Sequence, residues 1–130
     1  MARKWLSEQG VEFLAYVKAA AGIDCETFDP EVIEKNPMRA CDPLAAEKMA
    51  TRVRELIESG DSAGGIIECR VNGLPPGRGD PVFDKLEADL GKAILSIGAV
   101  RGFEVGAGFA AAGMTGSQHN DDMDSGGFLS

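Results

Sequence analysis

Two Asp-Pro dipeptides, Asp42-Pro43 and Asp80-Pro81, constrain the fold of this chain more than any other feature of its sequence. Each stands directly before a run of apolar residues at helical spacing. An aspartate carboxylate can accept hydrogen bonds from the free amides of a first helical turn, and proline fits the first helical position, where its missing N–H is not needed. The two dipeptides therefore predict two helix starts, at Pro43 and at Pro81.

Apolar residues after each predicted start recur on one helix face. In the first helix, which is expected to stop at Gly60, they are Ala45, Met49, Val53, Leu56 and Ile57. In the second helix, which is expected to run from residue 81 to about 97, they are Phe83, Leu86, Leu90, Ala93, Ile94 and Ile97. Each helix should bury this face, and Gly98 is expected to end the second one as a left-handed C-cap.

Strand patterns lie around these helices. Residues 11–19 and 64–73 alternate as strands do, and residues 100–105 are predicted to form a third strand. Residues 2–9 resemble the last turns of a helix that is closed by Gly10. The order strand, helix, strand, helix, strand predicts an α/β or α+β fold, a β-α-β-α-β layer with helices packed on a sheet.

The remaining segments carry weaker signals. Residues 20–41 contain glycine and proline without a sustained period, and they are predicted to form a long surface connection with one helical turn at residues 30–35. Residues 108–114 are expected to include a short strand, and residues 111–130 are expected to be loop or disordered. Together the pattern predicts a single partial domain over residues 1–130.

Composition narrows the class of protein. A chain of 130 residues with 44% hydrophobic content can build one core. A net charge of −8 argues against binding to nucleic acid or to an anionic membrane. The three cysteines, Cys25, Cys41 and Cys69, are far apart in the sequence and form no CxxC pair, which favours reduced thiols over a disulfide scaffold or a zinc site. No apolar run is long enough to span a membrane, so we expect a soluble, cytoplasmic protein.

Three motifs invite a functional interpretation, and each has a simpler structural one. Residues 78–80 spell Arg-Gly-Asp, but Asp80 is already expected to cap a helix. Residues 106–111 have the spacing of a dinucleotide-binding turn without the helix and acidic residue that must follow it. Residues 119–124 gather one histidine and several oxygen ligands without calcium-loop spacing, so no metal site is predicted. The residues taken alone therefore indicate a soluble domain and no particular reaction.

Longer runs carry a resemblance to a known family. Residues 60–68 (GDSAGGIIE), 73–109 (GLPPGRGDPVFDKLEADLGKAILSIGAVRGFEVGAGF) and 115–121 (TGSQHND) resemble the middle portion of chorismate synthases. Residues 2–13 and 36–49 are similar to their counterparts in the same family. The resemblance extends over essentially the whole chain, which is thus expected to be an internal fragment of a longer polypeptide.

The resemblance implies a fold and an activity. Members of the family form a β-α-β sandwich, are usually homotetramers and are cytoplasmic in bacteria. They eliminate phosphate from 5-enolpyruvylshikimate 3-phosphate in an anti-1,4 sense to give chorismate, and they require reduced FMN. As an alternative to a piece of this enzyme, the chain could be a non-catalytic assembly or interaction module that derives from the same layer.

Few of the family's site residues transfer to this chain. Gly98 and Ala99 match the segment that approaches FMN, and they are the expected cofactor contacts. No catalytic residue is assigned, because the paired histidines and arginine clusters of the family lie in other segments; His119 falls at a variable position. Asp61 and Ser62 are explained by a turn. The chain alone is therefore expected to be inactive.

Overall fold

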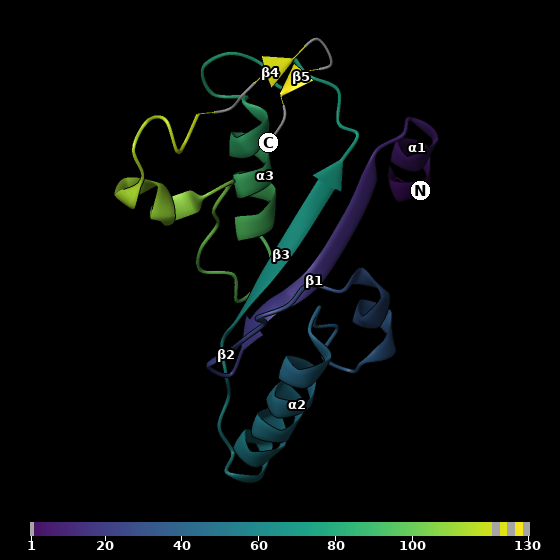
Figure 1. The fold of residues 1–130 in the computed structure, drawn as a ribbon, viewed down its shortest axis with the longest axis vertical. Helices are drawn as coiled ribbons and strands as arrows, with labels where there is room; N and C mark the ends of the chain where they lie inside the picture. Colours follow the sequence, from purple (N-terminus) through teal and green to yellow (C-terminus); the bar gives the residue numbers. More distant parts are fainter. Residues whose placement is uncertain (1, 121–122, 125–126, 129–130) are drawn as a thin grey trace. The chain divides into compact units, whose positions relative to one another are not determined.

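The computed structural model describes residues 2–120, 123–124 and 127–128, and the chain divides into two compact units, Met1–Leu74 and Pro75–Ser130. The first unit contains a three-stranded sheet and a helix of 16 residues, and the second contains a shorter helix and a two-stranded hairpin (Figure 1). Over the part of the chain that is described, no helix combines the length and apolar character needed to cross a membrane.

The sheet of the first unit is antiparallel, with strand order β2-β1-β3. Its strands are β1 (Glu12–Ala20), β2 (Ile23–Asp24) and β3 (Gly65–Asn72). Tyr16 of β1 lies opposite Glu68 of β3, and the register shifts once between Val17 and Ala19. The strands predicted at residues 11–19 and 64–73 are thereby confirmed. Most residues of β3 are exposed, and the Ile67 side chain is 74% exposed.

A short helix, α1 (Ala2–Glu8), precedes the sheet and ends as the sequence predicts. Gly10 has a φ of 78°, and its amide donates to the Ser7 carbonyl at 3.0 Å. The Val11 amide donates to Leu6 at 3.0 Å and starts the extended chain of β1. A left-handed residue costs little at a glycine, which is why this position ends the helix.

The helix α2 (Pro43–Glu58) begins where Asp42-Pro43 predicts. Asp42 accepts from the amides of Leu44 at 2.9 Å and Ala45 at 3.1 Å, so two of the free amides in the first turn are satisfied. At the other end Gly60 has a φ of 71°, and the Asp61 amide donates to the Leu56 carbonyl at 2.8 Å. A left-handed glycine with this hydrogen bond is a Schellman ending.

The core of the first unit lies where α2 and the connection between residues 20 and 41 meet the sheet. Two buried clusters form it: Ala40, Ala45, Ala46 and Met49 in one, and Tyr16, Ile33 and Cys41 in the other. The prediction that residues 20–41 form a surface connection is wrong, because Ile33, Ala40 and Cys41 are all buried. The helical turn is confirmed as a 3-10 helix, η1 (Pro30–Lys35), which turns Ile33 into the core.

In the second unit the helix α3 (Leu86–Leu95) starts later than Asp80-Pro81 predicts. The Asp80 amide donates to the Asp84 carbonyl at 2.8 Å, and Gly79 bridges to Lys85, so this stretch forms a closed loop. Val82 has a φ of 73°, which no right-handed helix allows. The predicted cap at Asp80 and the start at Pro81 are therefore wrong.

Two predicted strands of the second unit are also wrong. Residues 100–105 form no strand, because the described chain offers them no ladder partner and Phe103 packs on Gly91 of α3 instead. Within residues 108–114, the segment Gly108–Gly113 is a 3-10 helix, η2, in which alanines suit helical backbone better than extended backbone.

The last elements are the two-residue strands β4 (Met123–Asp124) and β5 (Gly127–Phe128), which pair antiparallel. Residues 121–122, 125–126 and 129–130 lie outside the described residues, so the expectation of loop or disorder over residues 111–130 stays a prediction. The antiparallel sheet with helices against it places the chain in the α+β class, one of the two classes that the sequence pattern allowed.

Candidate functional site

The expected cofactor contacts, Gly98 and Ala99, lie in a tight turn that follows α3. The helix ends at Leu95, and the Val100 amide then donates to the Ile97 carbonyl at 3.3 Å across the turn. Ala99 has a φ of 70°, whereas Gly98 does not adopt a left-handed conformation. The prediction of Gly98 as the left-handed cap is therefore wrong by one residue: the third position of the turn requires the positive φ, and alanine occupies it.

Both residues of this turn are accessible. Gly98 and Ala99 are exposed, and no atom lies within 4 Å of the position that a Cβ would take on Gly98. Within residues 2–120, neither backbone amide donates a hydrogen bond to a protein acceptor. The turn thus fits one limited role in holding a flavin, which is to offer backbone amides to its polar atoms. It supplies no charged group to the cofactor.

An open groove of about 340 Å³ runs beside α3. Its lining residues are Lys85, Leu86, Glu87, Leu90 and Val105. The leucines and the valine can accept an apolar surface, while Lys85 and Glu87 are the charged residues of the lining. The lining of this groove has no histidine and no cysteine, the side chains best suited to acid–base chemistry near neutral pH.

Gly91 determines how closely Phe103 approaches α3. It is buried within α3, and two atoms of the Phe103 ring lie 3.2 and 3.3 Å from the position that its Cβ would take. A side chain at residue 91 would push Phe103, and with it the following residues, away from the helix. Gly91 was not predicted as a packing position; the signal in the sequence was a glycine inside a helical pattern, which often marks a close approach.

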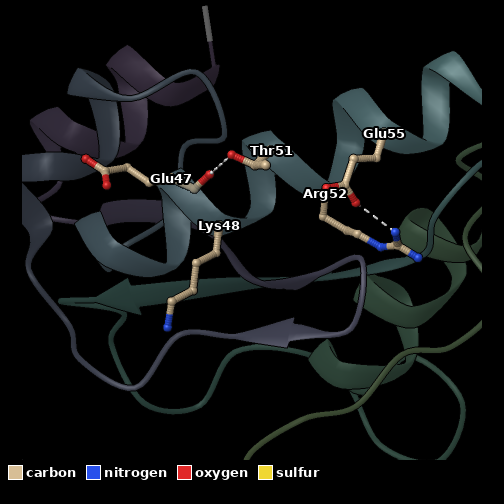
Figure 2. Close-up of a pocket in the computed structure, with 5 residues that line it drawn as sticks. All are labelled: Glu47, Lys48, Thr51, Arg52 and Glu55. Carbon is tan, nitrogen blue, oxygen red and sulfur yellow. Dashed lines mark hydrogen bonds and ion pairs between the residues drawn. The ribbon is translucent and has the colours of Figure 1, made fainter.

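A second surface feature lies along the outer face of α2 and is highly charged (Figure 2). Its residues are Glu47, Lys48, Thr51, Arg52 and Glu55. Arg52 pairs with Glu55 at 2.8 Å, and the Thr51 hydroxyl donates to the Glu47 carbonyl at 3.0 Å. All these contacts stay within one helix. This face therefore has the character of a solvated helix surface and not of a binding site.

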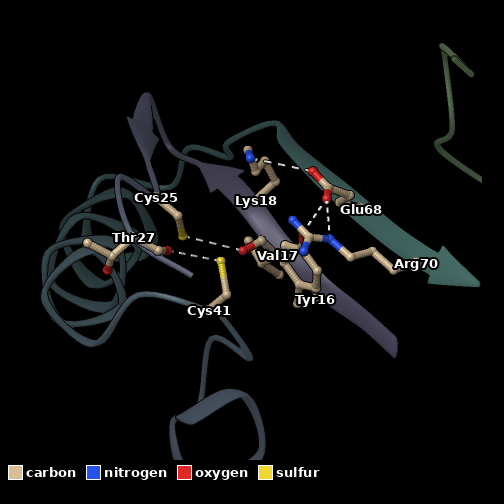
Figure 3. A network of polar contacts seen from close by, with 8 residues as sticks. All are labelled: Tyr16, Val17, Lys18, Cys25, Thr27, Cys41, Glu68 and Arg70. Atoms are coloured by element: carbon tan, nitrogen blue, oxygen red, sulfur yellow. Dashed lines mark hydrogen bonds and ion pairs between the residues drawn. The ribbon is translucent and has the colours of Figure 1, made fainter. Parts of the chain in front are cut away.

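A polar network crosses from β1 to β3 (Figure 3). The Tyr16 hydroxyl donates to Glu68, which also pairs with Arg70 at 3.0 Å and with Lys18 at 3.5 Å. The Arg70 guanidinium lies 4.0 Å from the centre of the Phe28 ring. Each charge has a partner inside the network, so these residues stabilise the strand pair and leave no group free for catalysis.

The network shifts the pKa values of its members in the directions that its contacts dictate. Burial, followed by the hydrogen bond and charge of Glu68, raises the pKa of Tyr16 to about 12. The Tyr16 hydroxyl and the two cations lower the pKa of Glu68. Glu68 in turn raises the pKa of Arg70. At neutral pH, Tyr16 is therefore a neutral donor and Glu68 a charged acceptor.

The other residues that the sequence analysis considered take local roles. Asp61 accepts from the Ser62 amide at 2.8 Å in the turn after α2, as a turn explanation requires. The His119 amide donates to the Thr115 carbonyl at 3.1 Å in an exposed turn. Asp121 and Asp122 lie outside the described residues. Among the residues that are described, no group of three or more His, Cys, Asp or Glu side chains could hold a metal ion.

Comparison with known proteins identifies the family. Residues 1–129 match the sequence model of the chorismate synthase family. The chain is 48% identical over 130 residues to a chorismate synthase of Syntrophobacter fumaroxidans, covering all of this chain and 37% of the relative. It is 49% identical over 127 residues to a chorismate synthase of Methanosarcina mazei, covering 95% of this chain and 35% of that protein.

A solved structure agrees with these sequences. A crystal structure of chorismate synthase matches with a TM-score of 0.85 and 27% identity, over 98% of this chain and 44% of the solved chain. The match confirms the α+β fold class and shows that the chain shares its fold with part of the solved enzyme. The chain spans about a third of the length of the curated relatives above. By sequence and by fold, the chain belongs to the chorismate synthase family.

Proposed function

We propose that this chain is a part of chorismate synthase, a lyase of the shikimate pathway that leads to aromatic amino acids. The reaction is the anti-1,4-elimination of phosphate from 5-enolpyruvylshikimate 3-phosphate to give chorismate. One observation carries the proposal: the family match extends over residues 1–129 of the 130. The solved relative supports it independently, because the likeness in fold extends over 98% of the chain.

The cofactor is reduced FMN, which when bound supplies electron density as the phosphate leaves. In this chain, Gly98 and Ala99 would hold the flavin through their exposed, unpaired backbone amides. The left-handed conformation of Ala99 supports this assignment, because it presents the amides of the turn in a strained geometry that an alanine does not adopt without cost. The chain's own contribution is to bind and orient the cofactor.

The chain by itself is inactive. A substrate with one phosphate and two carboxylates needs several cationic donors that converge on it. Of the thirteen Lys and Arg residues, five are paired with carboxylates of the chain itself: Lys18, Lys35, Arg39, Arg52 and Arg70. The net charge of −8 would also repel such a substrate. We therefore expect other segments of the whole enzyme to supply the remaining cationic donors. The homotetrameric assembly and the cytoplasmic location expected of the family are likewise proposed for the whole enzyme and not for this chain alone.

A chimera tests the proposal. The matching segment of the Syntrophobacter fumaroxidans chorismate synthase is replaced by this chain, and phosphate release from 5-enolpyruvylshikimate 3-phosphate is measured anaerobically with reduced FMN. We expect turnover from the chimera and none from the 130-residue chain alone. An inactive chimera that still binds FMN would contradict the proposed part in catalysis, and turnover by the isolated chain would contradict its dependence on the whole enzyme.

The cofactor contacts are tested in the same chimera. Ala99→Asp places a carboxylate at the turn, and we expect it to raise the dissociation constant for FMN at least about tenfold through repulsion and steric conflict. Ala112→Asp, the same change at an exposed residue of η2, is the matched control and should leave FMN binding unchanged. Equal effects of both variants would remove residues 98 and 99 from the site. A chain that folds but never supports FMN binding would favour a non-catalytic assembly module.

A further inference from the structure

Two cysteines that are distant in the sequence lie beside one another in the first unit. Cys41 is buried and belongs to the cluster that contains Tyr16 and Ile33, and the half-buried Cys25 packs against the same cluster. Cys25 follows β2 directly, and Cys41 stands just before α2. Figure 3 shows both sulfur atoms in the space between these two segments. The fold therefore brings together thiols that the sequence analysis treated as separate.

Hydrogen bonds to backbone amides, and not the thiols, hold the two segments together. The Asp42 carboxylate accepts from the amides of Glu26 and Thr27, both at 3.1 Å. The Asp29 amide donates to the Cys41 carbonyl at 2.8 Å. These bonds tie the residues directly after Cys25 to the residues at Cys41. Because they do not involve sulfur, the segments stay in place when the chemistry of the sulfur atoms changes.

The thiols themselves make only weak contacts. The Cys25 thiol donates to the Val17 carbonyl at 3.5 Å, and the Cys41 thiol donates to the Thr27 carbonyl at 3.5 Å. An S–H group is a weak donor, so the loss of both bonds costs little. Burial and the neighbouring Cys25 raise the pKa of Cys41, which keeps that thiol protonated and unreactive toward reagents in solution. Cys69 lies on β3 and is exposed.

We propose that Cys25 and Cys41 are a reversible modification site, a dithiol that low-molecular-weight disulfides such as oxidised glutathione convert into an intramolecular disulfide. The more accessible Cys25 thiolate attacks the small disulfide, and a mixed disulfide forms while one small thiolate leaves. Cys41 then loses its proton to solvent and attacks the Cys25 sulfur, and the second small thiolate leaves. Two protein thiols are oxidised, and one small disulfide is reduced to two thiols.

The disulfide would close the chain from residue 25 to residue 41 into a covalent loop. This loop contains η1, with Ile33 in the core, and it ends at the start of α2. A cross-link of this kind stabilises chiefly by restricting the unfolded chain. Oxidation therefore adds a covalent constraint to a connection that hydrogen bonds already hold in place, and reduction removes only that constraint.

The test uses the full 130-residue chain in glutathione buffers of graded ratio, followed by an acid quench, alkylation and peptide mapping by mass spectrometry. We expect the Cys25–Cys41 disulfide to exceed the two pairings with Cys69 at least about tenfold under native conditions, and this preference to disappear in urea. In a Cys69→Ala background, oxidation should raise the Tm by about 10 °C, and dithiothreitol should reverse the rise.

Two variants test separately whether Cys41 resolves the mixed disulfide on Cys25 and whether glutathione reaches Cys25 more readily than Cys41. In Cys41→Ala, Cys25 has no resolving partner and should accumulate as the mixed disulfide with glutathione. In Cys25→Ala, Cys41 should stay a free thiol at the same glutathione ratio. The proposal is overturned if the pairings are the same with and without urea, or if native wild-type protein ends with glutathione on Cys25 and a free thiol at Cys41.

Discussion

The two helices of this chain start from the same dipeptide and differ in almost every later respect. Asp42-Pro43 starts α2, while Asp80-Pro81 falls in a loop and α3 begins at Leu86. Asp42 is 5% exposed and also binds the amides of a neighbouring segment. The Asp80 side chain accepts no hydrogen bond from the described residues. The Asp-Pro dipeptide is therefore present twice, but only Asp42 accepts hydrogen bonds from the first turn of a helix and from a neighbouring segment.

The residues that follow each dipeptide account for the difference. After Asp42, the first helical turns bury Ala45, Ala46 and Met49 in the core. After Asp80, Val82 is exposed and Phe83 is 84% exposed. Capping contributes about 0.5 to 2 kcal/mol, which is less than the burial of a few apolar side chains. A capping signal therefore becomes a helix start where its first turn has a surface to pack on.

The C-terminal ends of α2 and α3 differ in the same way as their starts. α2 ends with Gly60 in the left-handed conformation, where glycine carries no steric cost. After α3, the left-handed residue is Ala99, and glycine stands one position earlier. Both ends of α2 thus follow local rules, and neither end of α3 does.

The largest difference is expected between core positions of the two helices. Met49→Ala removes a side chain with 0% exposure and should cost about 2 to 5 kcal/mol of unfolding free energy. Leu90→Ala in α3 removes a side chain that is 41% exposed and should cost about 1 kcal/mol or less. Denaturant unfolding measures the totals, and hydrogen exchange assigns them to each helix. Equal losses would show that α3 is as well packed as α2.

The next largest effect compares the two aspartates. Asp42→Ala removes the acceptor of four amides in two segments, one of them in a buried hydrogen bond, and it should lower the Tm by about 10 °C. Asp80→Ala, the matched control, should change the Tm by less than about 2 °C. A similar fall in both variants would mean that Asp80 caps a structure in solution after all.

Acid should weaken the Asp42 cap specifically. Its amide partners, first Ala45 and then Thr27 and Glu26, lower the pKa of Asp42 from its ordinary 3.8 to about 2. Because the folded pKa is the lower one, the charged carboxylate contributes stability above about pH 4, and this contribution is lost as the pH falls through about 2. The Tm difference between wild type and Asp42→Asn should therefore shrink from about pH 5 to about pH 2. Parallel curves would exclude the cap as an acid-sensitive group.

The smallest effects compare the helix ends and should have opposite signs. Gly60→Ala puts a side chain at a φ of 71° and should cost about 1 kcal/mol. Ala99→Gly relieves the same strain and should stabilise α3 by up to about 1 kcal/mol, less the entropy that glycine loses on folding. Hydrogen exchange of the α2 and α3 amides measures each change. Destabilisation by Ala99→Gly would show that the turn is not strained.

Local sequence signals were sufficient wherever the determining contact is close in the chain. The strands at residues 11–19 and 64–73, the helix from Asp42 to Gly60, and the turn at residues 30–35 all follow from spacing, caps and glycine. For the candidate site, the sequence supplied Gly98 and Ala99 only through the family resemblance, and their part in cofactor binding stays a prediction. The expectation that the chain lacks a complete catalytic set also came from that resemblance, and it too stays a prediction.

Tertiary structure decided the features that depend on distant partners. Nothing local marks Ile33, Ala40 and Cys41 as core residues; they are buried because α2 and β1 lie against them. The proximity of Cys25 and Cys41 depends on the Asp42 carboxylate, which joins their two segments. The start of α3 and the absence of a strand at residues 100–105 depend on which surfaces the chain offers for packing. Capping and spacing act over a few residues, while burial depends on residues that the local sequence does not contain.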